Sequence, residues 1–372
     1  MSCMHKYLVL TVLFIQSSTA LFRVFENITA MNNMPDSYPL TADGKPLRIA
    51  ILNLPVPGRF WAKLEKKFKA AQKAKEDELN YYDSRNYITG SYVKWLRSNN
   101  IEVVVIDYDI NNDQIAKIME TTNGLILQGG LLEIYKITSK IEVDSIGMRE
   151  TKNYFLSEFY QRTKFILDKA KQINQTRTFA IWGACLNLEA VLAVDSNHSM
   201  RFDYIHNVLH NTHIHVEENT QFSQFLDQYP GLKDNLNNKI NSFFSHNYGF
   251  LKSTFSNSQL PGLYYLLATS RNRKGKELVA LVENKQYPFI LSQFHVEKNP
   301  YELNHTIGTD ESPEAKYASA RILEYFMGKF DRWRYNPEEY EHHDEVASLV
   351  SFSKITEMGP LSTFDTFIFF KK

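Results

Sequence analysis

The fold is decided by the stretch Thr178-Phe179-Ala180-Ile181-Trp182-Gly183-Ala184-Cys185-Leu186-Asn187-Leu188-Glu189. Four of its first five residues, Phe179 to Trp182, are apolar and predict a buried strand, and apolar residues at helical spacing begin shortly after Gly183. Cys185 lies at the turn between the two elements. A thiol at such a turn projects clear of the backbone, and the positive end of the helix dipole favours its thiolate. The stretch therefore predicts a cysteine nucleophile on a strand-to-helix turn.

Strands and helices alternate on both sides of this turn. Strands are expected at 47–52, 102–107 and 125–127, and helices at 92–99, 113–120 and 151–172. Later strands are expected at 262–269, 277–283 and 288–294, followed by a helix from Pro313 and a last edge strand at 363–370. This alternation predicts an α/β fold with a mostly parallel central sheet and helices on both faces. Ligands of such sheets bind beyond the carboxyl ends of the strands, where Cys185 and Gln128-Gly129-Gly130 lie.

The composition restricts the class of function. The 372 residues include 42 basic and 42 acidic side chains, so the formal net charge is zero. This balance gives no electrostatic footprint for nucleic acid or for an anionic membrane surface. We therefore expect no nucleic-acid partner.

The N-terminus predicts entry into the secretory pathway. An apolar run at 7–15 precedes Ser18-Thr19-Ala20, which is typical of a signal peptide cleaved after Ala20, and an uncleaved anchor is the alternative. Cleavage would remove Cys3 and leave Cys185 as the only cysteine, either a functional thiol or an inert buried one. N-glycosylation is predicted at four sequons, which begin at Asn27, Asn174, Asn197 and Asn304. We expect residues 21–45 to form an extension, and residues 46–372 a single catalytic domain with a helical insertion around 55–83.

A base for the thiol follows a later strand. His295 and Glu297 are two residues apart at the end of the run 288–294, so in an extended segment their side chains share a side. Glu297 can then orient the imidazole of His295, and an imidazolium beside Cys185 would lower the pKa of the thiol. The alternative is a histidine at the core edge and a solvated carboxylate.

Four motifs resemble those of a known family. They are Asn86-Tyr87-Ile88-Thr89-Gly90-Ser91-Tyr92-Val93-Lys94-Trp95-Leu96, Asn123-Gly124-Leu125-Ile126-Leu127-Gln128-Gly129-Gly130, Gly183-Ala184-Cys185-Leu186-Asn187-Leu188-Glu189 and His295-Val296-Glu297-Lys298-Asn299-Pro300-Tyr301-Glu302. Their order and spacing are similar to those of gamma-glutamyl hydrolases, a branch of the class I glutamine amidotransferase-like superfamily. The resemblance implies a flavodoxin-like three-layer sandwich and a cysteine peptidase that cleaves γ-glutamyl amide bonds, chiefly of folylpoly-γ-glutamates. It implies no metal and no organic cofactor.

The resemblance also implies residue roles. Cys185 would be the nucleophile, His295 the general base and acid, and Glu297 the residue that orients it. Gly129, Gly130 and the amide of Leu186 would form the oxyanion hole. His246, in Phe244-Ser245-His246-Asn247-Tyr248, resembles a histidine of the family's substrate site. The family includes dimers and secreted or lysosomal (vacuolar) enzymes, so a homodimer and either compartment are open.

The chain departs from the family pattern at three places near the site. Asn187 replaces a glycine after the nucleophile, Gln128 replaces a proline before Gly129, and Val296 replaces the proline of H-P-E, which reduces rigidity there. These departures leave a second hypothesis open, namely a weak or inactive relative that binds γ-glutamyl ligands. A third is a metal enzyme that uses four histidines, His206, His210, His213 and His215, of which the first two have the spacing of helical zinc ligands.

Overall fold

The computed structural model describes residues 47–55, 86–99, 101–130, 132–144, 147–197, 203–205, 210–239, 242–302, 308–330, 354–357 and 366–370. The predicted signal peptide (1–20), the extension (21–45) and all of the expected insertion around 55–83 except its first residue lie outside these ranges. None of the helices within them is long and apolar enough to cross a bilayer.

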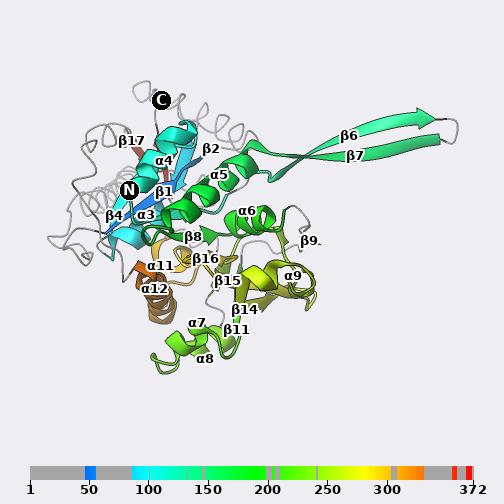
Figure 1. Ribbon diagram of the computed structural model, residues 1–372. Helices are drawn as coiled ribbons and strands as arrows, with labels where there is room; N and C mark the ends of the chain where they lie inside the picture. Colours follow the sequence, from blue (N-terminus) through cyan, green and yellow to red (C-terminus); the bar gives the residue numbers. More distant parts are fainter. Residues whose placement is uncertain are drawn as a thin grey trace, which may run out of the picture.

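An eight-stranded sheet forms the centre of the molecule (Figure 1). In spatial order its strands are β11 (His215–Val216), β14 (Tyr264–Arg271), β15 (Glu277–Asn284), β16 (Phe289–Ser292), β8 (Ala180–Ala184), β5 (Gly124–Leu127), β1 (Arg48–Leu52) and β4 (Glu102–Ile106). The five strands from β16 to β4 are parallel, and the other three pair antiparallel. The predicted mostly parallel sheet is confirmed, with an antiparallel extension at one edge.

Helices cover both faces of this sheet. Alternate residues of β1 show why, because Ile49 and Ile51 enter one buried cluster while Ala50 and Leu52 enter the other. The cluster with Leu52 includes α4 (Asn112–Glu120), α5 (Glu158–Ile173), α6 (Leu186–Asp195), α9 (Lys252–Ser256) and α10 (Leu260–Leu263). The cluster with Ile51 includes α3 (Gly90–Arg97), α7 (Gln221–Leu226), α8 (Leu232–Asn238) and α12 (Pro313–Met327). The three-layer α/β sandwich is therefore confirmed.

Smaller elements surround these layers. A four-stranded sheet has the order β17 (Lys354–Glu357), β18 (Thr366–Phe370), β3 (Asn86–Thr89) and β2 (Leu54–Pro55). Two short ladders pair β10 (His210–Thr212) with β12 (Ser242–Phe244), and β9 (Asp203–Tyr204) with β13 (Tyr248–Gly249). The chain also forms the short helix α11 (Lys298–Tyr301) and a 3-10 turn, Gly328–Phe330.

Two sequence predictions need correction. The helix expected from residue 151 begins at Glu158, where Ser157 caps it by accepting the amide of Tyr160. Residues before it form β7 (Gly147–Leu156), which pairs with β6 (Tyr135–Asp144) in a hairpin that projects from the body (Figure 1). The second correction concerns the C-terminal strand β18, which is not an edge strand because it lies between β17 and β3.

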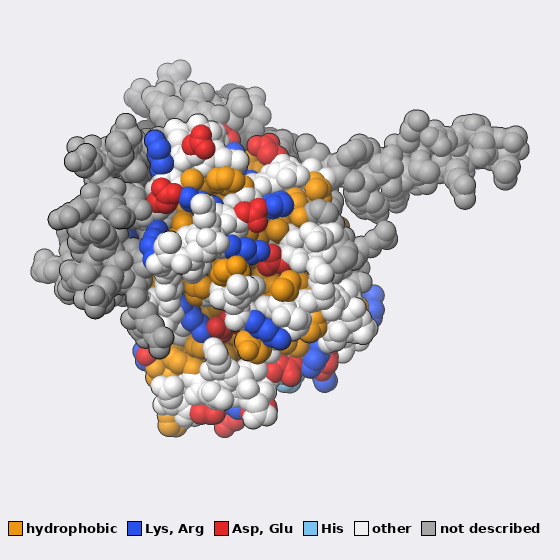
Figure 2. Space-filling view, in the orientation of Figure 1, with side chains coloured by type: hydrophobic (Ala, Val, Ile, Leu, Met, Phe, Trp, Pro, Cys, Tyr) orange, Lys and Arg blue, Asp and Glu red, His pale blue; other side chains and the backbone are white. Residues whose placement is uncertain are grey.

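The surface agrees with the neutral composition. Acidic and basic side chains are interspersed on the face shown in Figure 2, and neither sign forms a continuous field there. This face therefore offers no electrostatic footprint for a nucleic acid.

Candidate active site

Three neighbouring parallel strands bring the predicted site residues together. Cys185 follows β8, the Gly129–Gly130 turn follows β5, and His295 follows β16. Because β5 and β16 pair with β8 on either side, the three segments meet at one edge of the sheet. This is the carboxyl edge, where ligands of parallel sheets bind.

Cys185 has a constrained backbone. Its φ of 53° and ψ of −110° place it in the left-handed half of conformational space, as the residue that caps the N-terminus of α6. Its amide donates to the carbonyl of Ser292 at 2.6 Å, so β16 holds the turn in place. A non-glycine residue in such a conformation costs about 1–3 kcal/mol and persists only where the surrounding structure enforces it. The strained turn fits a thiol presented for reaction.

The thiol is neutral in this arrangement. Its sulfur donates to the carbonyl of Ser245 at 3.3 Å. Burial raises the pKa of Cys185 well above its ordinary value, and the charges of Glu189 and Glu297 raise it further, against the hydrogen bond from the amide of Leu186. The expectation that the helix terminus lowers the thiol pKa is therefore wrong for this state, because desolvation outweighs the amide of Leu186 and the charge of Lys298.

His295 and Glu297 form a buried pair. Nδ1 of His295 lies 2.8 Å from Oε1 of Glu297, so Nδ1 carries a proton toward the carboxylate and Nε2 is left to accept one. Burial alone would raise the pKa of Glu297, but the charge and hydrogen bond of His295, together with Lys298, lower it below its ordinary value. The carboxylate is thus ionised and able to stabilise an imidazolium.

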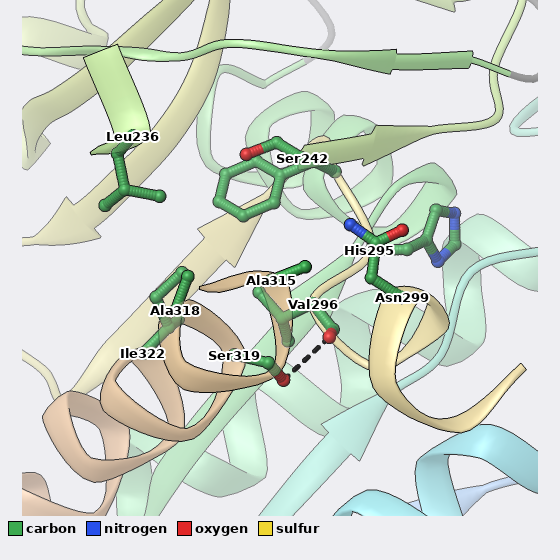
Figure 3. Close-up of a pocket in the computed structure, with 10 residues that line it drawn as sticks. Leu236, Ser242, His295, Val296, Asn299, Ala315, Ala318, Ser319 and Ile322 are labelled. Atoms are coloured by element: carbon green, nitrogen blue, oxygen red, sulfur yellow. Dashed lines mark hydrogen bonds between the residues drawn. The ribbon is translucent and has the colours of Figure 1, made fainter. Parts of the chain in front are cut away.

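Backbone contacts hold the segment that carries this pair. The amide of His295 donates to Phe243 at 2.8 Å, and Oγ of Ser319 donates to the carbonyl of Val296 at 2.8 Å. A small cavity lies beside this segment, lined partly by α12, and the imidazole of His295 points away from the α12 side chains Ala318 and Ile322 (Figure 3). These bonds anchor the position where Val296 replaces the proline of the family pattern.

Gly129 lies against both the thiol residue and the base. A Cβ built on it would lie 2.6 Å from Cε1 and 3.4 Å from Nε2 of His295, and 3.1 Å from Cβ of Cys185. The reactive nitrogen of His295 and Cys185 therefore border the same glycine. No hydrogen bond joins Sγ to His295 in the described part of the chain, so the thiol would have to turn from Ser245 before it could give its proton to His295.

Tyr92 is a site residue that sequence reasoning missed. Its hydroxyl accepts the amide of Gly129 at 3.1 Å and lies 3.3 Å from Nδ1 of His295. Tyr92 stands in the first of the four motifs, which was the available signal, but it is separated from His295 by 203 residues. The amide of Gly129 is therefore engaged by Tyr92, and it could bind an oxyanion only if this hydrogen bond breaks.

A polar group lies next to Cys185 on α6. Glu189 is buried and accepts a hydrogen bond at 3.3 Å from Nε2 of Gln293, the residue two before the base. His246 belongs to the same neighbourhood, because a Cβ built on Gly249 would lie 3.7 Å from its Cε1 and 3.6 Å from Oε1 of Gln293. Nδ1 of His246 donates to the carbonyl of Tyr248 at 2.6 Å. Gln293 thus binds Glu189, and His246 and Gln293 both lie close to Gly249.

Glu189 gives a prediction for stability. Burial raises the pKa of its carboxyl from 4.5 to about 8. Between these values the folded protein holds a proton that the unfolded chain has lost, so Glu189 lowers the free energy of unfolding as pH rises, by up to about 1.4 kcal/mol per pH unit. We expect Glu189→Gln to remove this slope. Urea unfolding at pH 5 and pH 8 measures this change in the free energy of unfolding. Glu133→Gln is the matched control, because Glu133 is exposed. Equal slopes in all three proteins would contradict the prediction.

A buried ion pair ties α11 to α3. Nζ of Lys298 lies 3.3 Å from Oε2 of Glu302 and donates to Oγ of Ser91 at 3.1 Å. Both charged side chains are almost fully buried. Residues that follow the base in its motif thereby connect it to the helix that carries Tyr92.

The histidine-rich segment that contains His206, His210, His213 and His215 does not have the arrangement expected of a helical metal site. His210 begins the strand β10, and His215 begins β11, while His206 lies outside the described residues. The rings of His213 and His215 pack edge to face, 4.8 Å between centroids. Across the described ranges, no three histidine, cysteine, aspartate or glutamate side chains form a group able to hold a metal.

Two of the four predicted glycosylation sites can be described. Nδ2 of Asn174 donates to the carbonyls of Ala170 and Phe179, at 2.8 and 2.9 Å. A glycan on that nitrogen would break the internal contacts. Asn197 is exposed. Asn27 and Asn304 lie outside the described ranges.

Comparison with known proteins relates the chain to the gamma-glutamyl hydrolases. No family model matches it. Gamma-glutamyl hydrolase B of Dictyostelium discoideum is 26% identical over 275 residues, covering 70% of this chain and 71% of the relative. Gamma-glutamyl hydrolase of Bos taurus is 22% identical over 280 residues, covering 75% and 81%. A solved structure of PurLQS from Thermotoga maritima aligns with a TM-score of 0.38 at 13% identity, covering 75% of this chain and 98% of that one. The sequence relatives confirm the resemblance indicated by the four motifs.

Proposed function

We propose that this protein is a cysteine hydrolase that cleaves γ-glutamyl amide bonds, with folylpoly-γ-glutamates as its substrates. The relatives named above are gamma-glutamyl hydrolases, which supports the reaction class. The observation that carries the proposal is the position of Gly129, where an added Cβ would meet both Cys185 and the Cε1–Nε2 edge of His295. His295 is in turn held by the buried carboxylate of Glu297.

The chemistry follows from these positions. Substrate binding turns the thiol of Cys185 from the carbonyl of Ser245, and Nε2 of His295 accepts its proton. The thiolate attacks the γ-carbonyl carbon, and the amides of Gly130 and Leu186 stabilise the oxyanion. His295 then protonates the leaving amine as the C–N bond breaks, which leaves a thioester on Cys185. Water, deprotonated by His295, attacks the thioester, and release of the γ-carboxylate product restores the thiol.

The remaining roles are assigned by position. Glu297 stabilises the imidazolium that forms when His295 takes the thiol proton. His246 directly follows Ser245, whose carbonyl accepts the hydrogen bond from Sγ of Cys185, so we assign His246 to substrate binding. None of the steps requires a metal or an organic cofactor. We also propose entry into the secretory pathway through residues 1–20, to the cell exterior or the lysosome.

The test compares glutamate release from a folyl-γ-polyglutamate by the parent protein and by Cys185→Ala. We expect turnover by the parent only, and a thioester adduct on Cys185 after an acid quench, detected by mass spectrometry. An α-linked polyglutamate is the matched control and is expected to remain uncleaved. Activity that survives the substitution would overturn the cysteine mechanism.

A second candidate is a protein that binds γ-glutamyl ligands without turnover. The observation that favours it is the hydrogen bond from Sγ of Cys185 to the carbonyl of Ser245, which engages the thiol away from a base. Binding of the substrate by the parent protein without glutamate release would establish this function instead. Calorimetric titration alongside the release assay separates the two.

A further inference from the structure

Two departures from the family pattern meet in the structure. Asn187 stands where the pattern has glycine, and Gln128 where it has proline. Nδ2 of Asn187 donates to the carbonyl of Gln128 at 2.6 Å, although the residues are 59 positions apart. Both residues are completely buried. The contact joins the first turn of α6 to the end of β5.

This contact holds one end of a peptide unit whose other end is also held. The carbonyl of Gln128 and the amide of Gly129 belong to the same planar peptide. Asn187 binds the oxygen, and the hydroxyl of Tyr92 accepts the N–H at 3.1 Å. Because the two anchors come from α6 and α3, on opposite faces of the sheet, rotation of this peptide would break at least one of them.

The side chain of Gln128 supplies further anchors. Its Oε1 accepts the amide of Thr89 at 3.0 Å, and its Nε2 donates to the carbonyls of Tyr87 at 2.9 Å and Leu52 at 3.3 Å. A proline at this position fixes φ through its ring, which glutamine lacks. In this protein three hydrogen bonds from the Gln128 side chain to β1 and β3 restrain the backbone at position 128, where the family pattern has a proline ring.

We propose that Asn187 and Gln128 form a brace that positions the Gly129–Gly130 turn for catalysis. The next peptide carries the amide of Gly130, a proposed oxyanion donor, and glycine permits many backbone angles. The direction of that amide therefore depends on the anchored peptide before it. The inference rests on the proposed function, because it assigns Asn187 a positioning role in the same site. Asn187 and Gln128 do not touch the reacting atoms.

The first test measures kcat and KM of Asn187→Ala and Asn187→Asp with a γ-glutamyl substrate. Aspartate keeps the shape but presents an oxygen to the carbonyl of Gln128, so it is expected to fail like alanine. We expect kcat to fall ~10- to 100-fold with KM within about two-fold, because a misdirected amide affects the transition state most. The exposed Asn257→Ala is the matched control. Unchanged kcat in both variants would overturn the brace.

Alkylation of Cys185 by iodoacetamide separates positioning from collapse of the turn. The brace touches neither the sulfur nor His295, so the alkylation rate is expected to stay within about two-fold of the parent. If the alkylation rate fell by the same factor as kcat, the substitution would have disturbed the strand-to-helix turn at Cys185 itself. This result would overturn the positioning role.

A double variant tests whether the two departures act together. Gln128→Pro and Asn187→Gly together restore the family pattern. If the residues form one unit, the double variant is less impaired than the product of the two single effects. A strictly multiplicative result would overturn the coupling.

Hydrogen exchange distinguishes failure of the brace from failure of the proposed function. Exchange of the Gly129 and Gly130 amides, measured by mass spectrometry without substrate, is expected to be faster in Asn187→Ala than in the parent. Unchanged exchange would overturn the brace, whether or not the parent is active. If exchange is faster in Asn187→Ala than in the parent, but the parent hydrolyses no γ-glutamyl substrate, the result would support the brace and refute the function.

Discussion

Gly129→Ala is expected to lower kcat by ~10²-fold or more while the protein remains folded. The added methyl group would lie 2.6 Å from Cε1 of His295 and 3.1 Å from Cβ of Cys185. The imidazole has little freedom to retreat, since Glu297 and Tyr92 both contact its Nδ1. The backbone of Cys185 is likewise fixed by Ser292. The methyl group therefore separates the thiol from its base.

Gly262→Ala is the matched control, because a Cβ on Gly262 has no atom within 4 Å. The control is expected to keep the kcat and the melting temperature of the parent. Near-ultraviolet circular dichroism establishes that both variants are folded. Full activity in a folded Gly129→Ala variant would show that this close approach does not matter for turnover.

The local part of the site was predictable from sequence. The strand-to-helix turn at Cys185 is predictable from twelve consecutive residues, because an apolar strand, a glycine and a helical pattern follow one another there. His295 and Glu297 are two residues apart, and their pairing follows from extended geometry. Because β8 and β16 are neighbouring parallel strands, the segments that follow them lie at the same carboxyl edge of the sheet. These features need little information from distant parts of the chain.

The rest depends on contacts that local patterns do not contain. Residues 151–156 have apolar positions that continue those of α5, and the sequence between the two strands, Ser145-Ile146, contains no glycine or asparagine, so the hairpin was missed. The position of β18 is set by β3, some 280 residues earlier in the chain. The raised pKa of Cys185 comes from burial, which is a property of the packed molecule. Tyr92 reaches the base only through tertiary structure.

Glu297→Gln is expected to lower kcat by ~10³- to 10⁴-fold, the size of effect seen when the carboxylate behind a catalytic histidine is neutralised. The carboxylate is completely buried and lies 2.8 Å from Nδ1 of His295. An amide of the same shape can still accept from Nδ1, but it carries no charge to balance the imidazolium formed when the thiol proton moves. The loss therefore falls on the transition state, and KM is expected to change little.

Glu283→Gln is the matched control for removing a buried charge. Glu283 is buried on β15 and binds Tyr325 and Lys329, so its loss is expected to lower the free energy of unfolding without a comparable loss of kcat. Glu297→Asp keeps the charge on a shorter side chain and is expected to recover part of the activity. If Glu297→Gln retained kcat within about ten-fold of the parent, the imidazolium would need no counter-charge. His295 would then act through position alone, and the raised thiol pKa would have to be overcome by the substrate itself.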